Sequence, residues 1–275
     1  MIETNDPRLW RDRLPLLQPD THKHQRGRLG VVAGAATRTG AARLAARAGL
    51  RIGAGIVRIL CPPDATPIIA PTIEAIMLFE YGGPETLARL AEPLDAVVIG
   101  PGAGLDEGTV RNLEALAGTG AVMVVDADAL TLFRDRQDEL WAHLDRDDVL
   151  TPHEGEFERL FPGLLAEGRE TAARTAAERA GAVVVLKGNR TLIAAPDGRM
   201  RINENGTPLL ATAGSGDVLA GMVGGLVAQR MDSFEAASAA VWMHADAARR
   251  FGPGLIAEDL HAGLPATLRH LLDQD

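Results

Sequence analysis

Cysteine and aromatic residues are scarce in this chain. Cys61 is the single cysteine among 275 residues, and aromatic residues make up 4%. One cysteine excludes an internal disulfide and is typical of proteins in a reducing compartment. Cys61 stands in the aliphatic run Ile59-Leu60-Cys61 with no histidine or second cysteine nearby in the sequence, so we expect a core side chain and not a nucleophile. Aliphatic residues and alanine must therefore fill the core.

Long apolar segments and an excess of positive charge are also missing. The longest stretches without a charged residue are about a dozen residues, too short to cross a bilayer. Residues 1–6 contain acids and no apolar segment, unlike a secretory signal. The net charge of −9 argues against general nucleic-acid binding. A small basic patch at residues 22–28 could hold a phosphate, but we favour a solvated patch. We expect a soluble, cytoplasmic protein that binds neither membranes nor nucleic acid.

Short aliphatic runs alternate with helical segments from Leu29 onward. The runs are uniformly apolar, which is typical of strands covered on both faces. They lie at 29–33, 56–60, 95–99, 121–125, 147–150 and 182–186. Helices are expected between them at 40–52, 84–92, 107–117, 127–143, 153–161 and 168–180. This alternation predicts an α/β sandwich with a mostly parallel sheet.

The two ends of the chain depart from this rhythm. Residues 1–28 contain three prolines and little periodicity, so we expect a loosely structured lead-in or a short surface helix. Residues 191–195 and 200–203 flank a Pro-Asp-Gly-Arg turn and predict a hairpin. Residues 217–272 read as three helices. Because no repeat or linker is visible, we expect a single domain over residues 1–275.

The most informative segment is a glycine-rich turn that leads into an apolar helix, Ala-Thr-Ala-Gly-Ser-Gly-Asp-Val-Leu-Ala-Gly at residues 211–221. Gly214 and Gly216 allow close approach of a ligand to the backbone, and Ser215 and Asp217 are typical N-cap residues. The first amides of the helix and its dipole would form an anion hole at Gly214, Ser215 and Gly216. A capped surface helix is the alternative, but the apolar flanks favour a buried cleft.

Asp217 is an unusual residue for a site that only binds phosphate, because its carboxylate repels phosphate. The residue makes sense as a general base that removes a proton from a hydroxyl group beside a phosphoryl group. We therefore predict that Asp217 is catalytic.

The residues that follow the aliphatic runs carry most of the remaining chemistry. In open α/β sheets, ligands bind beyond the carboxyl ends of the strands, so these residues should converge. They are Gly34, Gly40-Ala41, Gly100 to Gly104, Asp126 to Asp128, Thr151 to Glu154 and Lys187 to Asn189. The glycine pairs tested at residues 53–55, 100–104 and 214–216 fail the dinucleotide-binding fingerprint, and no Walker sequence is present.

Several of these residues have two interpretations. Asp126 and Asp128 could bind Mg²⁺ through water, or could cap the helix that follows, which is at least as well supported. A functional and a structural role are equally compatible with His153. Lys187 would supply a positive charge for phosphate, or could be an exposed residue at the end of a strand.

Taken together in their order and spacing, these motifs resemble the ADP/ATP-dependent NAD(P)H-hydrate dehydratases, carbohydrate-kinase-like repair enzymes of the ribokinase-like superfamily. The resemblance extends from about His22 to Leu272. It is carried by residues 30–34, 40–55, 100–102, 126–130, 151–157, 187–191, 213–221 and 254–260. It implies a ribokinase-like three-layer α/β/α sandwich with a mostly parallel central sheet. The epimerase domain that is fused to some relatives has no room in this chain.

The resemblance also implies a reaction. The family restores NADH or NADPH from the S epimer of its hydrate, NADHX or NADPHX, while ADP or ATP loses its terminal phosphate in the presence of Mg²⁺. Asp217 would take the proton of the C6 hydroxyl as the phosphoryl group arrives, and ADP is the expected donor. A separate NAD(P)H-hydrate epimerase would handle the R epimer. The family further suggests a homo-oligomer, a tetramer.

Site residues follow from the same resemblance. The hydrate would be bound by Ala41, Gly102, Gly104, His153 and Asp217. The AMP part of the nucleotide would be contacted by Lys187, Gly188, Asn189, Arg190, Thr191 and Gly216. No metal ligands are implied. The chain departs from the family pattern at His24, Thr207 and Leu209, where many members have glycine, asparagine and glycine.

Two other functions are compatible with the same motifs. A small-molecule kinase of this superfamily, acting on a hydroxyalkyl heterocycle, would use the same anion hole and base. A catalytically silent nucleotide-binding regulator would not need the carboxylate of Asp217. Release of inorganic phosphate, in place of a phosphorylated product, distinguishes a dehydratase from a kinase.

Overall fold

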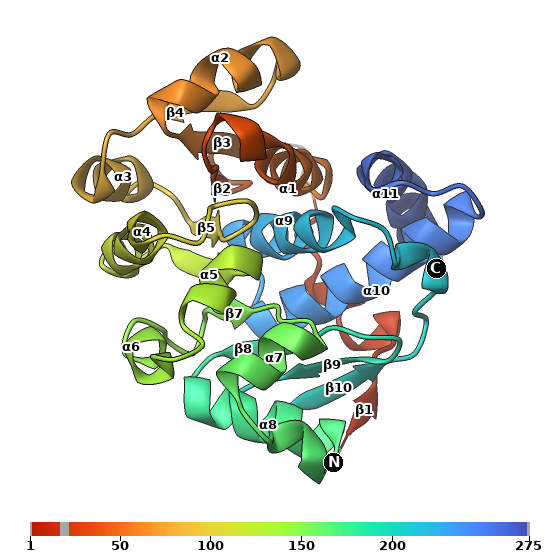
Figure 1. Ribbon diagram of the computed structural model, residues 1–275. Helices are drawn as coiled ribbons and strands as arrows, with labels where there is room; N and C mark the ends of the chain where they lie inside the picture. Colours follow the sequence, from red (N-terminus) through yellow and green to blue (C-terminus); the bar gives the residue numbers. More distant parts are fainter. Residues whose placement is uncertain (1, 17–21, 274–275) are drawn as a thin grey trace.

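A single sheet runs through the part of the chain that this computed structural model describes, residues 2–16 and 22–273 (Figure 1). Its ten strands are ordered β1-β10-β9-β8-β7-β6-β5-β2-β3-β4. All neighbours are parallel except β8/β9 and β9/β10, which are antiparallel. The strands are β1 Glu3–Thr4, β2 Arg28–Val32, β3 Ile56–Cys61, β4 Met77–Glu80, β5 Ala96–Ile99, β6 Val122–Val125, β7 Val149–Leu150, β8 Val183–Leu186, β9 Thr191–Ala194 and β10 Met200–Asn203.

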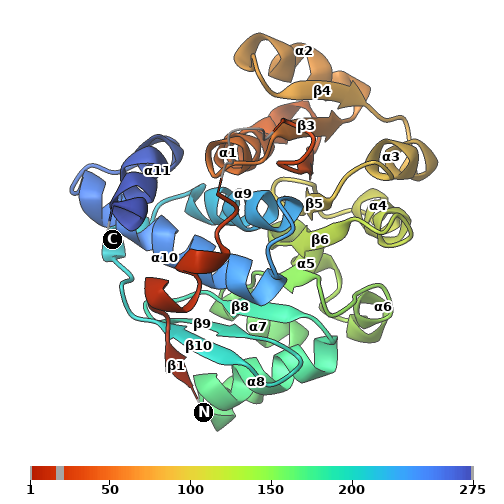
Figure 2. The ribbon, with the colours of Figure 1, turned by 180° about the vertical axis from the view of Figure 1, so that it is seen from behind.

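Helices cover both faces of this sheet (Figures 1 and 2). One layer contains α1 Thr39–Arg51, α9 Ser215–Ala228, α10 Ser233–Phe251 and α11 Ala257–Leu272. The other contains α3 Pro84–Ala91, α4 Glu107–Ala117, α5 Ala127–Leu132, α6 Gln137–Trp141, α7 Glu154–Leu160 and α8 Arg169–Ala180. The short α2, Thr66–Ile69, lies beside the edge strand β4. The expected three-layer, mostly parallel α/β sandwich is confirmed.

The strands are apolar throughout because each face packs on its own core. Val31 and Val98 belong to the core beneath α9, whereas the adjacent residues Val32 and Val97 belong to the core on the opposite face. Side chains alternate between the two faces of a strand, so both sets must be apolar. Cys61 is fully buried in the first core, as expected.

The helix expected over residues 127–143 is wrong. The structure has two short helices there, and α5 ends at Leu132 because Phe133 turns inward and is 1% exposed. The charged run 134–136 offers no apolar residue to continue a buried face, so the chain turns before α6 begins. Two elements near one edge of the sheet, α2 and β4, were not predicted.

The segment expected as a loose lead-in is integrated into the fold where the structure describes it. Strand β1 pairs in parallel with β10, and Trp10 is completely buried. Two 3₁₀ turns, Pro7–Leu9 and Arg11–Arg13, place the tryptophan between them. Residue 1 and residues 17–21 of the predicted lead-in lie outside the described residues.

Helix α9 approaches α1 very closely. A Cβ built on Gly221 would lie 2.1 Å from the carbonyl oxygen of Ala45, and one on Gly225 would lie 2.8 Å from that of Gly49. No larger side chain fits, which explains why a buried helix tolerates glycine despite its poor helix propensity. This contact holds α9 against α1. Within the described ranges, no helix is long and apolar enough to cross a membrane.

Candidate active site

The loops that follow β2, β5 and β6 touch one another at the carboxyl edge of the sheet. A Cβ on Gly34 would lie 1.9 Å from the carbonyl oxygen of Gly102, and a Cβ on Gly100 would lie 1.7 Å from that of Asp126. After β7 and β8, an isolated parallel bridge joins His153 to Lys187. The predicted convergence of these residues at one edge is confirmed.

The first turn of α9 is capped by backbone geometry alone. Its N-cap is Gly214, with φ of +87°, and no side chain bonds to the first amides. The expectation that Ser215 or Asp217 would cap the helix is wrong, because the Ser215 hydroxyl lies 3.3 Å from Nε2 of His244. Among the described residues, no acceptor bonds to the amide groups of Gly216 and Asp217. Two N–H groups at the positive end of the helix dipole are thus available to an anion.

Asp217 lies in the first turn of α9, in a poorly solvated position. The surroundings raise the pKa of its carboxyl group to about 6, with burial as the largest cause and the negative charge of Asp126 as the second. The ammonium group of Lys187 lowers it, and Asp128 raises it. The carboxylate therefore ionises near neutral pH, which is the range that suits a general base.

Asp126 holds Lys187 in place. Oδ1 of Asp126 lies 2.8 Å from the Lys187 ammonium, and the aspartate is 1% exposed. Asp126 makes no capping bond to α5, so the capping interpretation of this residue is wrong. A Cβ on Gly216 would lie 3.4 Å from Nζ of Lys187, which places this cation against the amide groups of α9.

Glu156 also faces Lys187 and was not predicted as a site residue. Burial is the largest cause of the raised pKa of Glu156, whereas the positive charge of Lys187 lowers this pKa. For Lys187, burial lowers the pKa, but Asp126, Glu156 and Asp217 together raise it more. Lys187 is therefore a permanently charged lysine among three acids.

His153 has a structural role at the start of α7. Its Nδ1 accepts hydrogen bonds from the amide groups of Gly155 and Glu156, at 2.9 and 3.2 Å. Glu156 completes a capping box by accepting from the amide of His153 at 2.9 Å. With Nδ1 used as an acceptor, the proton of the neutral ring is on Nε2. The same histidine lines the cavity described next.

A cavity of about 720 Å³ opens beside these groups. Its lining includes seven of the predicted site residues: His153, Lys187, Gly188, Asn189, Thr191, Ser215 and Gly216. Leu210, Leu219, Val241 and Ala245 form an apolar part of the wall. Such a mixture of apolar surface and few polar groups is typical of ligand sites. The side chain of Arg190 is not in this wall; it pairs with Glu204 at 2.7 Å.

Ala41, Gly102 and Gly104 form a separate group outside the lining of this cavity. A Cβ on Gly102 would lie 3.4 Å from Cβ of Ala41, and Gly104 donates its amide proton to Asp128 at 2.9 Å. Asp128 is the acid that also raises the pKa of Asp217. The structure thus brings Ala41, Gly102 and Gly104 together, but it places His153 with the residues expected to bind the nucleotide.

Two polar residues of the cavity wall were not predicted, Asn203 and His244. His244 is 5% exposed, and burial lowers its pKa to about 4, so the ring is neutral at physiological pH. Asn203 lies in the hairpin of β9 and β10, and His244 lies in the alanine-rich helix α10. The sequences of these segments indicate only a structural role. Their contacts are distant in sequence, so no local pattern could have identified them.

The positions that depart from the family pattern have local explanations. Thr207 accepts a hydrogen bond from the amide of Leu209 at 3.4 Å and caps a 3₁₀ turn, Pro208–Leu210, while the side chain of Leu209 packs on the core. The patch at residues 22–28 begins with four exposed residues and leads into the amino end of β2, away from the cavity. The preferred interpretation as a solvated patch is consistent with this placement.

A family model and two similar proteins of known sequence indicate one family. A family model described as NAD(P)H-hydrate dehydratase matches residues 29–261. The chain is 34% identical to the ADP-dependent (S)-NAD(P)H-hydrate dehydratase of Lactiplantibacillus plantarum, over 91% of this chain and 87% of that one. It also matches bifunctional NAD(P)H-hydrate repair enzymes, such as that of Gloeobacter violaceus at 41% identity, over 91% of this chain. The chain spans about half the length of these bifunctional relatives.

The fold has a close structural counterpart. The ADP/ATP-dependent NAD(P)H-hydrate dehydratase from Bacillus subtilis, co-crystallised with ATP and Mg²⁺, superposes with a TM-score of 0.84 at 27% sequence identity. The superposition covers 98% of this chain and 99% of that chain. The two chains therefore share one architecture from end to end.

Proposed function

Because the chain belongs to the NAD(P)H-hydrate dehydratase family, we propose that it uses ADP to return the S epimer of NADHX or NADPHX to NADH or NADPH. The observation that carries this proposal is the start of α9. There, Asp217 with a pKa of about 6 lies in the first turn of the helix together with two unbonded backbone amides. Its neighbour Gly216 and the Lys187 ammonium line the cavity of about 720 Å³.

Phosphoryl transfer is the first step that this geometry supports. Asp217 removes the proton of the C6 hydroxyl while that oxygen attacks the terminal phosphorus of ADP. The bond between the terminal phosphorus of ADP and the bridging oxygen breaks, and AMP leaves with that oxygen. The amide groups of Gly216 and Asp217 donate to the phosphoryl oxygens, whose charge they stabilise without reorganisation.

Elimination completes the reaction. The C6–O bond breaks and its electrons leave with the phosphate, which carries the former hydroxyl oxygen. The electron pair of a C5–H bond forms the C5–C6 double bond, and the departing phosphate takes up the C5 proton. The role of the protein in this step is to hold the departing phosphate. Lys187 supplies a positive charge beside Gly216 for this purpose, because three acids keep it protonated.

Nucleotide and substrate would occupy different sides of Asp217. The cavity lined by Lys187, Gly188, Asn189 and Thr191 suits the AMP part of ADP. The group formed by Ala41, Gly102 and Gly104 would contact the hydrate. His153 belongs with the nucleotide side by its position in the cavity wall.

Mg²⁺ would accompany the nucleotide in this proposal. Within the described ranges, no group of three or more histidine, cysteine, aspartate or glutamate side chains could hold a metal ion. Mg²⁺ in nucleotide sites keeps several waters and takes substrate phosphates as ligands, with one or two carboxylates at most. A metal bound mainly through phosphate oxygens fits these residues, and no step is assigned to it.

The expected partners are also part of the proposal. An NAD(P)H-hydrate epimerase would handle the R epimer, and the bifunctional NAD(P)H-hydrate repair enzymes among the relatives support this link. The expected homo-oligomer, a tetramer, stays a prediction that analytical ultracentrifugation tests.

The decisive assay supplies chemically prepared hydrate with ADP or with ATP. The proposal requires release of inorganic phosphate together with recovery of absorbance at the wavelength of reduced nicotinamide. A phosphorylated product that accumulates without that recovery would instead identify a kinase. Faster turnover with ATP than with ADP would contradict the assignment of the phosphoryl donor.

A further inference from the structure

The N-terminal segment, residues 2–16, reaches the wall of the cavity through a row of three hydrogen-bonded asparagine side chains, Asn5, Asn203 and Asn205. Nδ2 of Asn5 lies 3.0 Å from Oδ1 of Asn203, and Nδ2 of Asn203 lies 2.7 Å from Oδ1 of Asn205. Asn5 and Asn203 are 4% and 2% exposed. Asn203 lines the cavity, whereas Asn5 lies 198 residues away in sequence and outside the family match.

The orientation of each side-chain amide in this row is determined by the partners at its two ends, which can only donate or only accept a hydrogen bond. The indole N–H of Trp10, which can only donate, lies 3.1 Å from Oδ1 of Asn5. Nδ2 of Asn5 donates at 2.8 Å to the carbonyl oxygen of Ser238, which can only accept. The Asn5 amide therefore has one possible orientation, and it presents N–H to Asn203.

The hydrogen bonds of Asn205, at the other end of this row, independently require the same orientation. Nδ2 of Asn205 donates at 3.0 Å to the carbonyl oxygen of Trp242. Oδ1 of Asn205 must then accept from Asn203, and Oδ1 of Asn203 must accept from Asn5. Since both ends demand the same direction, a flipped amide at any position would place two like groups against each other.

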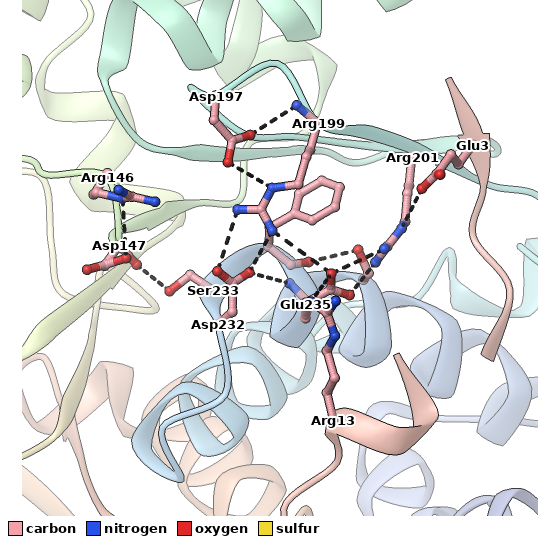
Figure 3. A network of polar contacts seen from close by, with 12 residues as sticks. Glu3, Arg13, Arg146, Asp147, Asp197, Arg199, Arg201, Asp232, Ser233 and Glu235 are labelled. Carbon is pink, nitrogen blue, oxygen red and sulfur yellow. Dashed lines mark hydrogen bonds and ion pairs between the residues drawn. The ribbon is translucent and has the colours of Figure 1, made fainter. Parts of the chain in front are cut away.

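Two ion pairs hold the N-terminal segment against the same elements (Figure 3). Arg13 bonds to the buried Glu235 of α10 at 2.8 Å, and Glu3 lies 3.5 Å from Arg201 of β10. In Figure 3, Glu3 contacts Arg201 at the upper right, and Arg13 reaches Glu235 from below. The segment is thus clamped to β10 and α10, the two elements that contribute Asn203 and His244 to the cavity.

We infer that Asn5, which the N-terminal segment holds in place, is a positioning residue that orients the Asn203 amide toward the bound nucleotide. This inference rests on the proposed function, because it takes the cavity as the nucleotide site. After its bonds to Asn5 and Asn205, Asn203 retains one N–H and one oxygen lone pair. These groups suit a ribose hydroxyl or the edge of the base, which need a donor and an acceptor side by side.

The test compares Asn5→Ala with Arg8→Gln in the full-length protein. Arg8 is an exposed residue of the same segment that pairs with Asp6. Asn5→Ala should raise both the dissociation constant of ADP, measured by calorimetry, and the KM for ADP about tenfold, because a buried amide loses its orientation. The kcat should stay within about twofold, and Arg8→Gln should match the unaltered protein in both.

Further variants separate positioning from mere stability. Asn203→Ala should match Asn5→Ala, and the double variant should be no worse than Asn203→Ala, since Asn5 acts through Asn203. Trp10→Phe keeps the buried ring but loses one donor, so a smaller rise of about threefold is expected. If Asn5→Ala fails to fold, Trp10→Phe decides the question.

Specific outcomes overturn the inference. It is wrong if Asn5→Ala lowers the melting temperature but binds ADP like the unaltered protein, or if the Asn5 and Asn203 effects add. An unaltered protein that binds ADP without dehydratase activity overturns only the proposed function, since ADP affinity still tests Asn5. An unaltered protein that binds no ADP overturns both.

Discussion

Lys187 and Asp126 form an ion pair of 2.8 Å next to the amide groups of α9. The pair is largely shielded from water, since the side chains are 20% and 2% exposed. An incoming phosphate would bind a Lys187 ammonium that Asp126 already holds in position, so the lysine side chain would not have to leave solvent and become ordered. The cation is thus fixed in place before the nucleotide arrives, which lowers the ordering cost of binding.

Replacement of the proposed base should abolish most turnover. Asp217→Asn should lower kcat by roughly 10²–10⁴, because the amide cannot accept the hydroxyl proton. The measurement is phosphate release with recovery of nicotinamide absorbance. Asp138→Asn, at an exposed position on α6, serves as the control and should be as active as the unaltered protein. Equal turnover in the two variants would rule out the mechanism.

The pH dependence of kcat should report on the charges around Asp217. Activity should fall as the pH drops through about 6, where the carboxylate becomes protonated. Asp126→Asn should move this fall to lower pH, because the loss of a negative charge lowers the pKa of Asp217. Lys187→Met should raise that pKa, since a positive charge is lost.

Carbon-13 NMR titration of the aspartate carboxyl groups measures this pKa without substrate, and so does not depend on activity. Shifts of the same sign in Asp126→Asn and Lys187→Met would contradict the electrostatic account.

Alanine substitutions at two glycines of α9 should have opposite effects on the melting temperature. A Cβ at position 216 would meet only ordinary contacts, 3.4 Å from Lys187 Nζ and 3.8 Å from Asp126. Gly216→Ala should therefore keep or raise the melting temperature, while the added methyl group at the cavity raises the KM for ADP. Gly221→Ala should be strongly destabilised, because its Cβ would lie 2.1 Å from Ala45. Thermal unfolding and steady-state kinetics check both expectations.

His244 should make the protein less stable in acid. Its pKa is about 4 in the folded protein, against 6.5 in the unfolded chain. The unfolded chain binds the proton more readily, so stability is fully present above pH 6.5 and is lost as the pH falls toward 4. His244→Gln should flatten the melting temperature between these pH values, whereas exposed His24→Gln should not. A slope unchanged in His244→Gln would show that the ring titrates normally.

Much of the fold could be predicted from the sequence because parallel strands carry a strong signal. Runs such as 95–99 and 182–186 are apolar on both faces, and the observed strands Ala96–Ile99 and Val183–Leu186 fall inside them. Edge elements lack this signal: β4 has exposed residues at both ends, and β1 spans two exposed residues. Both strands depend on pairing with distant neighbours and not on their own composition.

The candidate site divides in the same way. Gly216 and Lys187 could be placed from sequence because strand ends and helix starts are local features. The pairing of Asp126 with Lys187, the contact of Ser215 with His244 and the bond from Asn5 to Asn203 span 61, 29 and 198 residues. Such contacts follow from the completed fold. They are the reason why the expected caps at Ser215 and Asp126 were wrong.

The contact between Trp10 and Trp242 has a spectroscopic consequence. Their rings meet edge to face with centroids 6.0 Å apart, close enough for the two indole transitions to couple. The third tryptophan, Trp141, stacks on Phe161 in the core on the other face of the sheet. Circular dichroism in the indole bands therefore contains an exciton signal from one pair alone. Undocking of residues 2–16 would abolish that signal, so the measurement needs no added label.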